Sequence, residues 1–361
     1  MTLTPLILQA YRQPASLPSL SLADWDLLLR QSVAGYVQAG LLVMLEELDL
    51  LQRLPAEVRE HLEWARTLSE RHHQGVRYEV AMIARALADC GLPLILLKGA
   101  AYTMAGLPPA RGRLYSDVDI IVPEASLPDV EASLMMHGWA ATHHDAYDQR
   151  YYRAWMHELP PMVHVLRHTA IDVHHAILPR TASVRPDPDK LRAAAVPIPG
   201  SDGLHTLAPT DIVLHSAVHL FYDGEFDHGL RDLVDIHRLL LHFGRQPGFW
   251  PALTARAVEL ELARPLFYAL RYAAELLHTP VPDEALQASA AARPGPLLLR
   301  LMDALFRRAL LPMHPSCGDA WTPAARFCLY LRANWLRMPP LLLARHLFHK
   351  AFLSPKEDKQ Q

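Results

Sequence analysis

The chain has 361 residues, of which 51% are hydrophobic and 20% are charged. That composition is typical of a folded globular protein with room for two or three domains, and it excludes a disordered chain. The formal net charge of −3 provides no overall positive field, so we expect no long RNA or DNA as a partner.

The cysteines and the apolar stretches predict where the protein resides. The three cysteines form no CxxC pair, a usage that suits free thiols in a reducing compartment. The N-terminus has no basic segment followed by the apolar core of a signal peptide. The longest apolar runs, at 94–97 and 340–344, are far too short to cross a bilayer. We therefore expect a cytoplasmic protein with no membrane span.

The chain begins with helices and then changes its periodicity. From about Ser21 to Asp89 apolar residues recur at three- and four-residue steps, and Gly91 gives a stop signal. The compact apolar run Leu92–Leu97 predicts a buried strand. A tight turn at Lys98-Gly99 and a short helix follow it.

The central segment reads as alternating short strands and helices. A strand is expected at Ser116–Val122, and a helix from Pro123 to about Met136, where a proline and an early glutamate are typical start signals. The segment 179–203, rich in Pro, Arg and Asp, reads as a loop or linker. Alternating aromatic, β-branched and polar residues predict three further strands, at Arg150–Trp155, Met162–His168 and Ala170–Ile177.

The remainder of the chain is predicted to be helical. Helices are expected at Pro209–Tyr222, Leu230–Phe243 and Pro251–Leu277, with shorter ones to about Phe352 and a polar tail after it. The overall prediction is an α+β fold with a mixed-sheet core flanked by N- and C-terminal helical regions. We divide the chain into an N-terminal helical region at 1–67, an α/β core at 68–204 and a C-terminal helical domain at 205–361.

The sequence RLYSDVDIIVP places two carboxylates at the start of an apolar strand. Residues two apart on a strand point to the same face, so Asp117 and Asp119 project together while Val118 and Ile120 point to the other side. Two neighbouring carboxylates repel each other unless a cation lies between them. Mg²⁺ is the natural candidate because it prefers hard oxygen ligands and substrate phosphates, and two such ions suit a phosphoryl displacement.

A third carboxylate follows in TAIDVHHAIL. Asp172 and His174 share one face of that predicted strand. If the strand neighbours the one that carries Asp117, Asp172 completes a site of three carboxylates, as a metal ligand or as the base that takes a proton from an acceptor hydroxyl. His174 is expected to orient Asp172.

The turn LLKGAAY supplies residues suited to a phosphate. Gly99 and Ala100 are small residues at a strand-to-helix junction, where backbone N–H groups can contact a phosphate. Lys98 either neutralises that phosphate or extends to water from the strand end. Arg113 either contacts the substrate or forms an ion pair with Asp117.

Two histidines lie four residues apart on a predicted helix. His215 and His219 have a spacing that permits a shared metal, but no glutamate follows the first of them, so a metalloprotease motif is excluded. We expect them to pack behind the site that holds Asp117. A metallohydrolase built on these two together with His228 and His237 would need all four side chains to converge.

These motifs together resemble the DNA polymerase β-type nucleotidyltransferase superfamily, and within it the bacterial family of uncharacterised nucleotidyltransferases. The resemblance rests on LKGAAY, on R-x-x-S-D-V-D-I-I-V, on I-D-V-H-H and on the helical segment LHSAVHLFYDGEFDHGLRDLVDIHRLL. The chain departs from the superfamily at Ala100, where a glycine or serine is usual. The resemblance implies a nucleotidyltransferase fold that uses two Mg²⁺ ions.

The implied activity is transfer of a nucleoside monophosphate from an NTP, with ATP favoured, to a hydroxyl of a small molecule or of a protein side chain. The alternative is a catalytically silent module that binds a nucleotide or a partner protein. In the active case Asp117, Asp119 and Asp172 are the catalytic metal ligands. The residues expected to contact the nucleotide are Lys98, Gly99, Ala100, Arg113 and Ser116, with His174, His215 and His219 behind them.

Overall fold

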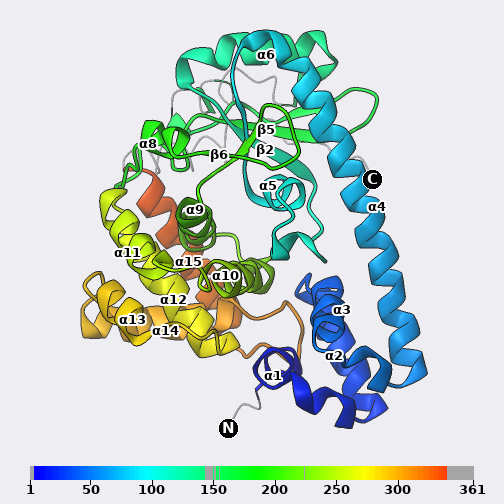
Figure 1. Ribbon diagram of the computed structural model, residues 1–361. Helices are drawn as coiled ribbons and strands as arrows, with labels where there is room; N and C mark the ends of the chain where they lie inside the picture. The colour runs from blue at the N-terminus through cyan, green and yellow to red at the C-terminus, as the bar shows by residue number, and fades with distance from the viewer. Residues whose placement is uncertain (1–3, 143–148, 150–151, 154, 223, 340–361) are drawn as a thin grey trace.

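The computed structural model describes residues 4–142, 149, 152–153, 155–222 and 224–339. One seven-stranded mixed sheet is flanked by helices from both ends of the chain (Figure 1). The predicted α+β fold class is therefore confirmed. The division into three regions at 67/68 and 204/205 stays a prediction.

The N-terminal region is helical, as expected. Helix α2 begins with a capping box in which Ser21 and Asp24 each bond the backbone N–H of the other. The 31-residue helix α4 extends from these helices to the sheet (Figure 1). Among the described residues no single helix is long and apolar enough to span a membrane, although α2 and α3 pass that test as a pair bent by 119°. The four helices are α1 (Leu6–Arg12), α2 (Leu22–Ala34), α3 (Gln38–Glu47) and α4 (Ala56–Ala86).

The sheet has the order β3-β4-β5-β2-β1-β7-β6. Its centre is β2, which runs parallel to β5 on one side and antiparallel to β1 on the other. Helices α5 (Lys98–Met104) and α6 (Leu127–Met136) follow β1 and β2 in the chain. The strands are β1 (Leu94–Leu96), β2 (Asp117–Ile121), β3 (Trp139–Ala141), β4 (Met162–His164), β5 (Ala170–His174), β6 (Val196–Pro197) and β7 (Leu204–Thr206).

Several predicted elements of the core differ from the structure. The strand expected at Arg150–Trp155 is wrong at its described residues, 152, 153 and 155, which are helical; the others lie outside the described residues. The strand at Met162–His168 ends at His164, because the chain turns there and His168 adopts a positive φ of 57°. The linker at 179–203 contains helix α8 (Pro188–Ala193) and strand β6. Strand β7, which lies parallel to β1, was not predicted.

The C-terminal region is a set of packed helices. The helix expected at Pro251–Leu277 is two helices, because Glu261 between them adopts a left-handed φ of 60°. The predicted helices at 340–352 and the polar tail lie outside the described residues. The helices are α9 (Pro209–Tyr222), α10 (Gly229–Phe243), α11 (Phe249–Glu259), α12 (Ala263–Leu277), α13 (Asp283–Ala290), α14 (Pro296–Ala309) and α15 (Thr322–Arg337).

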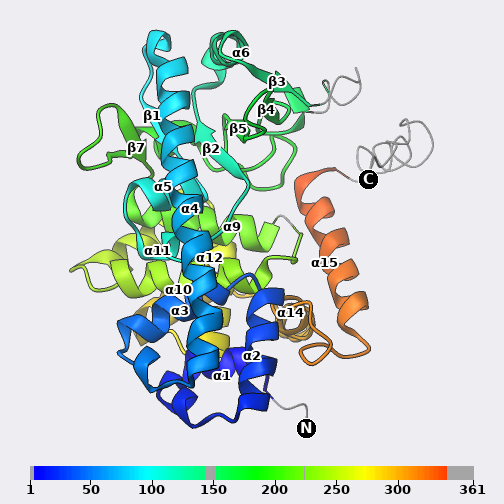
Figure 2. The ribbon, with the colours of Figure 1, turned by 90° about the vertical axis from the view of Figure 1, so that its right-hand side faces the viewer.

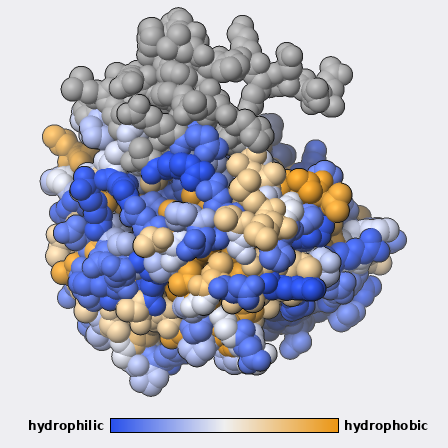
Figure 3. Space-filling view, turned by 90° about the horizontal axis from the view of Figure 1, so that it is seen from above, coloured by the Kyte–Doolittle hydropathy of each residue, from blue (hydrophilic) through white to orange (hydrophobic). Residues whose placement is uncertain are grey.

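One contiguous hydrophobic core joins the sheet to both helical regions. The face seen in Figure 3 is largely hydrophilic, with separate apolar patches. Helix α15 lies along the side of the molecule and its end approaches the sheet (Figure 2). There the backbone N–H of Ser183 donates to the carbonyl of Leu336 at 3.0 Å, which brings the end of α15 next to the segment that follows β5.

Candidate active site

Strand pairing brings the three predicted carboxylates together. Strands β2 and β5 are parallel neighbours, with Asp119 opposite Asp172. On β2 the alternation is as expected, since Val118 and Ile120 are buried on the opposite face. Carboxylate oxygens of Asp117, Asp119 and Asp172 all lie within 4.8 Å of one another. These three side chains, here called the aspartate triad, form a group that can hold a metal ion.

Asp119 is the most constrained member of the triad. It is 2% exposed, and its Oδ1 accepts a hydrogen bond from Nζ of Lys98 at 2.8 Å and lies 2.9 Å from Nε2 of His174. Burial alone would raise the pKa of Asp119, but Lys98 and His174 outweigh it and hold the pKa well below its usual range. Asp119 is therefore ionised.

Asp172 has the opposite electrostatic environment. Burial and the neighbouring Asp119 carboxylate raise its pKa to about 7. In the absence of a metal ion Asp172 thus holds a proton far more readily than a free aspartate does. A raised pKa at one of three clustered carboxylates is the expected result when the neighbouring cations do not balance all of their negative charge.

Lys98 occupies an unusual backbone position. It is the first residue of α5 and has a φ of 45°, in the left-handed region that side-chain-bearing residues rarely adopt. The backbone N–H of Leu97 donates to the carbonyl of Asp119 at 2.9 Å, which fixes this junction against β2. Burial would lower the pKa of Lys98, but the Asp119 carboxylate outweighs it and raises the pKa. Lys98 is therefore a fixed cation beside the triad.

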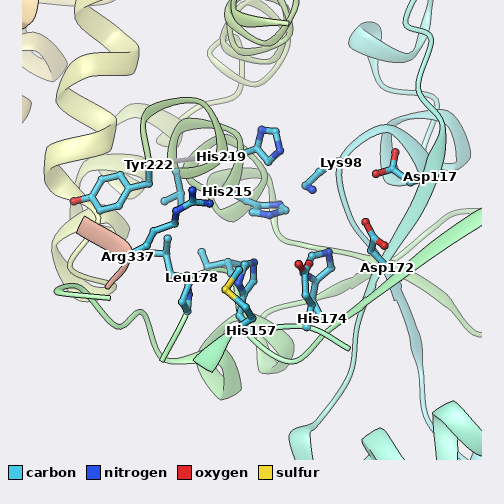
Figure 4. Close-up of a pocket in the computed structure, with 15 residues that line it drawn as sticks. Lys98, Asp117, His157, Asp172, His174, Leu178, His215, His219, Tyr222 and Arg337 are labelled. Atoms are coloured by element: carbon cyan, nitrogen blue, oxygen red, sulfur yellow. The ribbon is translucent and has the colours of Figure 1, made fainter. Parts of the chain in front are cut away.

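A cavity of about 250 Å³ opens beside the triad. In Figure 4, Asp117 and Asp172 lie at one end of this cavity, and Tyr222 and Arg337 lie at the other. We call it the histidine cavity because four histidines line it. Its polar lining residues are Lys98, Asp117, His157, Glu158, Asp172, His174, His215, His219, Tyr222 and Arg337.

The predicted histidines line this cavity, but their contacts differ from expectation. The nearest acidic partner of His174 in the triad is Asp119, since its Nε2 lies 2.9 Å from that carboxylate rather than beside Asp172. His215 projects from α9, and burial together with the charge of Lys98 holds its pKa well below the usual value. One turn further on, Nδ1 of His219 lies 3.7 Å from Oδ2 of Asp232 on α10.

The other two histidines of the metallohydrolase hypothesis lie elsewhere. The ring of His228 packs against Tyr36 at 4.3 Å, and Nδ1 of His237 lies 2.7 Å from the Thr279 hydroxyl. Among the described residues the four imidazoles do not converge on one point, and the groups that can hold a metal do not include them.

Gly99 and Ala100 lie at the start of α5, where packing restricts their size. A Cβ on Gly99 would approach the ring of Tyr115 to 2.7 Å. Ala100 is 1% exposed and belongs to the hydrophobic core. Close packing therefore accounts for small residues at both positions.

Arg113 lies away from the histidine cavity. Its side chain is 8% exposed and forms ion pairs with Asp235 and with Asp232, the latter at 3.4 Å. Both partners belong to α10, so Arg113 connects the loop before β2 to the C-terminal helices. The expected alternative pairing with Asp117 is not among its ion pairs in the described residues.

Ser116 and Asp117 line a second cavity, of about 460 Å³. We call it the tyrosine cavity because Tyr78 and Tyr115 form part of its wall. Asp117 lines both cavities, so this member of the aspartate triad is shared between them. Arg167, at the edge of the tyrosine cavity, is already paired with Glu79 at 2.6 Å.

Four polar residues that line the histidine cavity were not predicted: His157, Glu158, Tyr222 and Arg337. His157 and Glu158 lie in an irregular segment just before Pro160-Pro161, where no periodic pattern indicates their direction. Arg337 ends α15, which is distant in sequence from the triad. Tyr222 shares one face of α9 with His215 and His219, and that spacing is the one signal that could have placed it there.

The comparisons with known proteins identify a family for this chain. No curated protein and no solved structure matches it. The family model described as uncharacterised nucleotidyltransferase matches residues 21–278, well over half of the chain, and spans β2, β5 and α9. The chain belongs to this family of uncharacterised nucleotidyltransferases.

Proposed function

We propose that this protein is a Mg²⁺-dependent enzyme that transfers a nucleoside monophosphate from an NTP to a hydroxyl group. The observation that carries the proposal is the aspartate triad, whose three carboxylates lie within 4.8 Å of one another beside a cavity. Family membership supports a nucleotide substrate. Among NTPs we propose ATP first.

The donor set of the triad suits Mg²⁺. All three ligand groups are carboxylates, the hard oxygen donors that Mg²⁺ prefers, and the raised pKa of Asp172 indicates a deficit of positive charge at this point. We propose that Asp117, Asp119 and Asp172 hold the ions. When bound, Mg²⁺ would neutralise charge on the reacting phosphate and on the leaving pyrophosphate.

The histidine cavity is the proposed site of the NTP phosphates. Lys98 lies at its wall as a fixed cation, and Arg337 lies at the far end. His215 and His219 add ring nitrogens that can donate hydrogen bonds to phosphate oxygens. At about 250 Å³ the cavity suits a triphosphate better than a complete nucleotide, so we place the base and ribose toward its opening.

The tyrosine cavity is the proposed site of the acceptor. Transfer requires two substrates at one set of carboxylates, and Asp117 lines both cavities. The walls of this second cavity combine two tyrosines with small neutral residues, and its arginine is paired with Glu79. Such walls suit an uncharged hydroxyl-bearing group, either a small molecule or a protein side chain. Asp172 is not among the residues that line this cavity, but its carboxylate lies within 4.8 Å of that of Asp117. We therefore propose that Asp172 takes the proton from an attacking hydroxyl held beside Asp117.

Arg113, Gly99 and Ala100 receive supporting roles in this proposal. The ion pairs of Arg113 with α10 set the position of the loop that leads into β2. Gly99 and Ala100 let α5 pack closely enough for Lys98 to reach Asp119. Of the five residues predicted to contact the nucleotide, Ser116 is the one that lines the tyrosine cavity. The cytoplasmic location also stays a prediction.

The experiment incubates the purified chain with Mg²⁺ and each α-labelled NTP, with and without cell extract to supply acceptors. The Asp117→Asn/Asp119→Asn double variant is the control. Transfer of label that requires Mg²⁺ and is lost in the control supports the proposal. Nucleotide binding without transfer or pyrophosphate release, for all four NTPs, supports the catalytically silent module instead.

A further inference from the structure

A second group of side chains next to the triad has the composition of a transition-metal site. Ligand atoms of His157, Glu158 and His174 all lie within 4.8 Å of one another. The set offers two imidazoles and one carboxylate. Mg²⁺ rarely selects imidazole, whereas Zn²⁺ and its neighbours in the first transition row bind it well.

The backbone holds these three residues in register. Glu158 forms an antiparallel bridge with His174, and the N–H of Leu159 donates to the carbonyl of Val173 at 2.9 Å. The N–H of His175 donates to the carbonyl of His157 at 2.8 Å. The segment 157–159 is thus fixed along the end of β5, so the three ligand groups approach one another from a hydrogen-bonded framework.

His174 has the orientation of a metal-ligating histidine. Its Nε2 lies 2.9 Å from Asp119, and its Nδ1 lies 3.2 Å from Glu158. A carboxylate that accepts the N–H on one ring nitrogen leaves the lone pair on the other nitrogen for a metal, an arrangement that is common in zinc proteins. Here Asp119 is that carboxylate, and a metal ion would take the place of the proton between Nδ1 and the Glu158 carboxylate, which lie 3.2 Å apart in the metal-free chain.

His157 supplies an independent observation. Its Nδ1 is buried, and within the described part of the chain this atom has no hydrogen-bond partner. Its ring stacks on that of His174, with centroids 5.3 Å apart. Buried polar atoms without a partner are uncommon in folded proteins, and a bound ion is one of the few arrangements that satisfy such an atom.

We propose that His157, Glu158 and His174 bind one divalent transition-metal ion of the zinc class, separate from the Mg²⁺ proposed for the aspartate triad. All three residues line the histidine cavity. Coordination positions of the ion that no protein ligand fills would therefore face that cavity. The two sites are linked through Asp119, which belongs to the triad and also contacts His174.

The test uses Co²⁺ as a spectroscopic substitute for Zn²⁺, with the full-length chain first stripped of metal. Excess Mg²⁺ is present throughout to occupy the carboxylates. We expect one Co²⁺ per chain, with visible absorption bands that indicate nitrogen ligation, and displacement of Co²⁺ by Zn²⁺. His157→Ala and Glu158→Gln should each weaken Co²⁺ binding by at least about 10-fold to 100-fold.

Two control variants separate Co²⁺ binding at this site from binding elsewhere on the chain. Asp117→Asn alters the triad but not the proposed ligands, so the Co²⁺ spectrum should persist. His137→Ala removes an exposed histidine and should change nothing. Thermal unfolding followed by circular dichroism confirms that each variant is folded. If His157→Ala does not fold, the test rests on Glu158→Gln, which preserves side-chain size.

Three results would overturn the proposal. The first is no Co²⁺ binding by the wild-type chain, which would make His174 simply an imidazolium between two carboxylates. The second is an unchanged spectrum in folded His157→Ala and Glu158→Gln. The third is loss of the spectrum in Asp117→Asn with retention in His157→Ala, which would assign the ion to the triad. All readouts are of metal binding, so they are independent of nucleotidyl transfer.

Discussion

Asp119 and Asp172 are directly opposite each other on the parallel strands β2 and β5. The pairing brings together two carboxylates from distant segments of the chain, and Asp117 adds a third from the same face of β2. Lys98 and His174 balance the charge of Asp119 alone. The excess negative charge at Asp117 and Asp172 is the feature on which the proposed activity depends.

Loss of a triad carboxylate is expected to abolish transfer without unfolding the protein. Asp172→Asn should lower the rate of label transfer by about 10²-fold to 10⁴-fold, as expected for loss of a general base. Because the substitution removes like-charge repulsion, the melting temperature of the metal-free variant should equal or exceed that of the wild type. Asp202→Asn, in an exposed bend, is the matched control. Full activity in Asp172→Asn would remove this residue from the mechanism.

The contribution of Asp172 to the stability of the metal-free protein should fall as pH rises from about 4 to about 7. Comparison of the wild type with Asp172→Asn isolates it from buried histidines such as His72 and His237, whose lowered pKa values act in the opposite direction. Asp172 has a pKa of about 7 in the folded chain, above that of an unfolded aspartate, so the folded state binds more protons within this window. Its contribution to the free energy of unfolding is therefore complete at the acidic end and lost as pH passes 7.

A bound cation would replace that proton, so Mg²⁺ should raise the melting temperature more at about pH 8 than at about pH 5. Thermal unfolding with and without Mg²⁺ at both pH values measures the effect. Asp172→Asn should reduce the difference between them. An equal Mg²⁺ effect at both pH values would show that the ion binds without involving Asp172.

Lys98 is expected to stabilise the fold in addition to its proposed contact with the NTP phosphates. Lys98→Met leaves Asp119 buried without its ammonium partner, so the free energy of unfolding should decrease by about 3–5 kcal/mol. Lys190→Met removes a half-exposed lysine that pairs with Glu259, and should have little effect on stability. Urea unfolding compares the two. Equal small losses would mean that the contact of Lys98 with Asp119 contributes little.

Arg113 is expected to act through structure rather than through nucleotide contact. Arg113→Gln should lower the free energy of unfolding by about 3–5 kcal/mol, because Asp235 loses its buried cationic partner. Arg111→Gln, which breaks an exposed pair with Glu47 at 3.0 Å, should have little effect. At a temperature where the variant is folded, its KM for NTP should match that of the wild type. A large rise in KM with unchanged stability would restore Arg113 to the nucleotide site.

The core of the site was predictable because it depends on local rules. The two-residue period of a strand places Asp117 and Asp119 on one face. The prediction that Asp172 joins them needed one further condition, that β5 neighbours β2, and this pairing is present. The helix that carries His215 and His219 followed from its apolar periodicity, and both histidines line the histidine cavity.

The parts that were missed depend on long-range or irregular structure. The partner of Arg113 is Asp235, more than a hundred positions further along the chain, and no periodic pattern indicates such a pair. His157 and Glu158 lie outside any regular strand and are oriented by backbone hydrogen bonds to β5. Strand β7 has three residues and exists because β1 and β6 pair with it.

The most direct test of the proposed transfer compares α-labelled with γ-labelled NTP in parallel reactions containing Mg²⁺ and the accepting fraction. Nucleotidyl transfer predicts that the α label enters the acceptor, that the γ label leaves as pyrophosphate in equal amount, and that Asp172→Asn loses both. Transfer of the γ label to the acceptor, or incorporation of the α label without pyrophosphate, would contradict it.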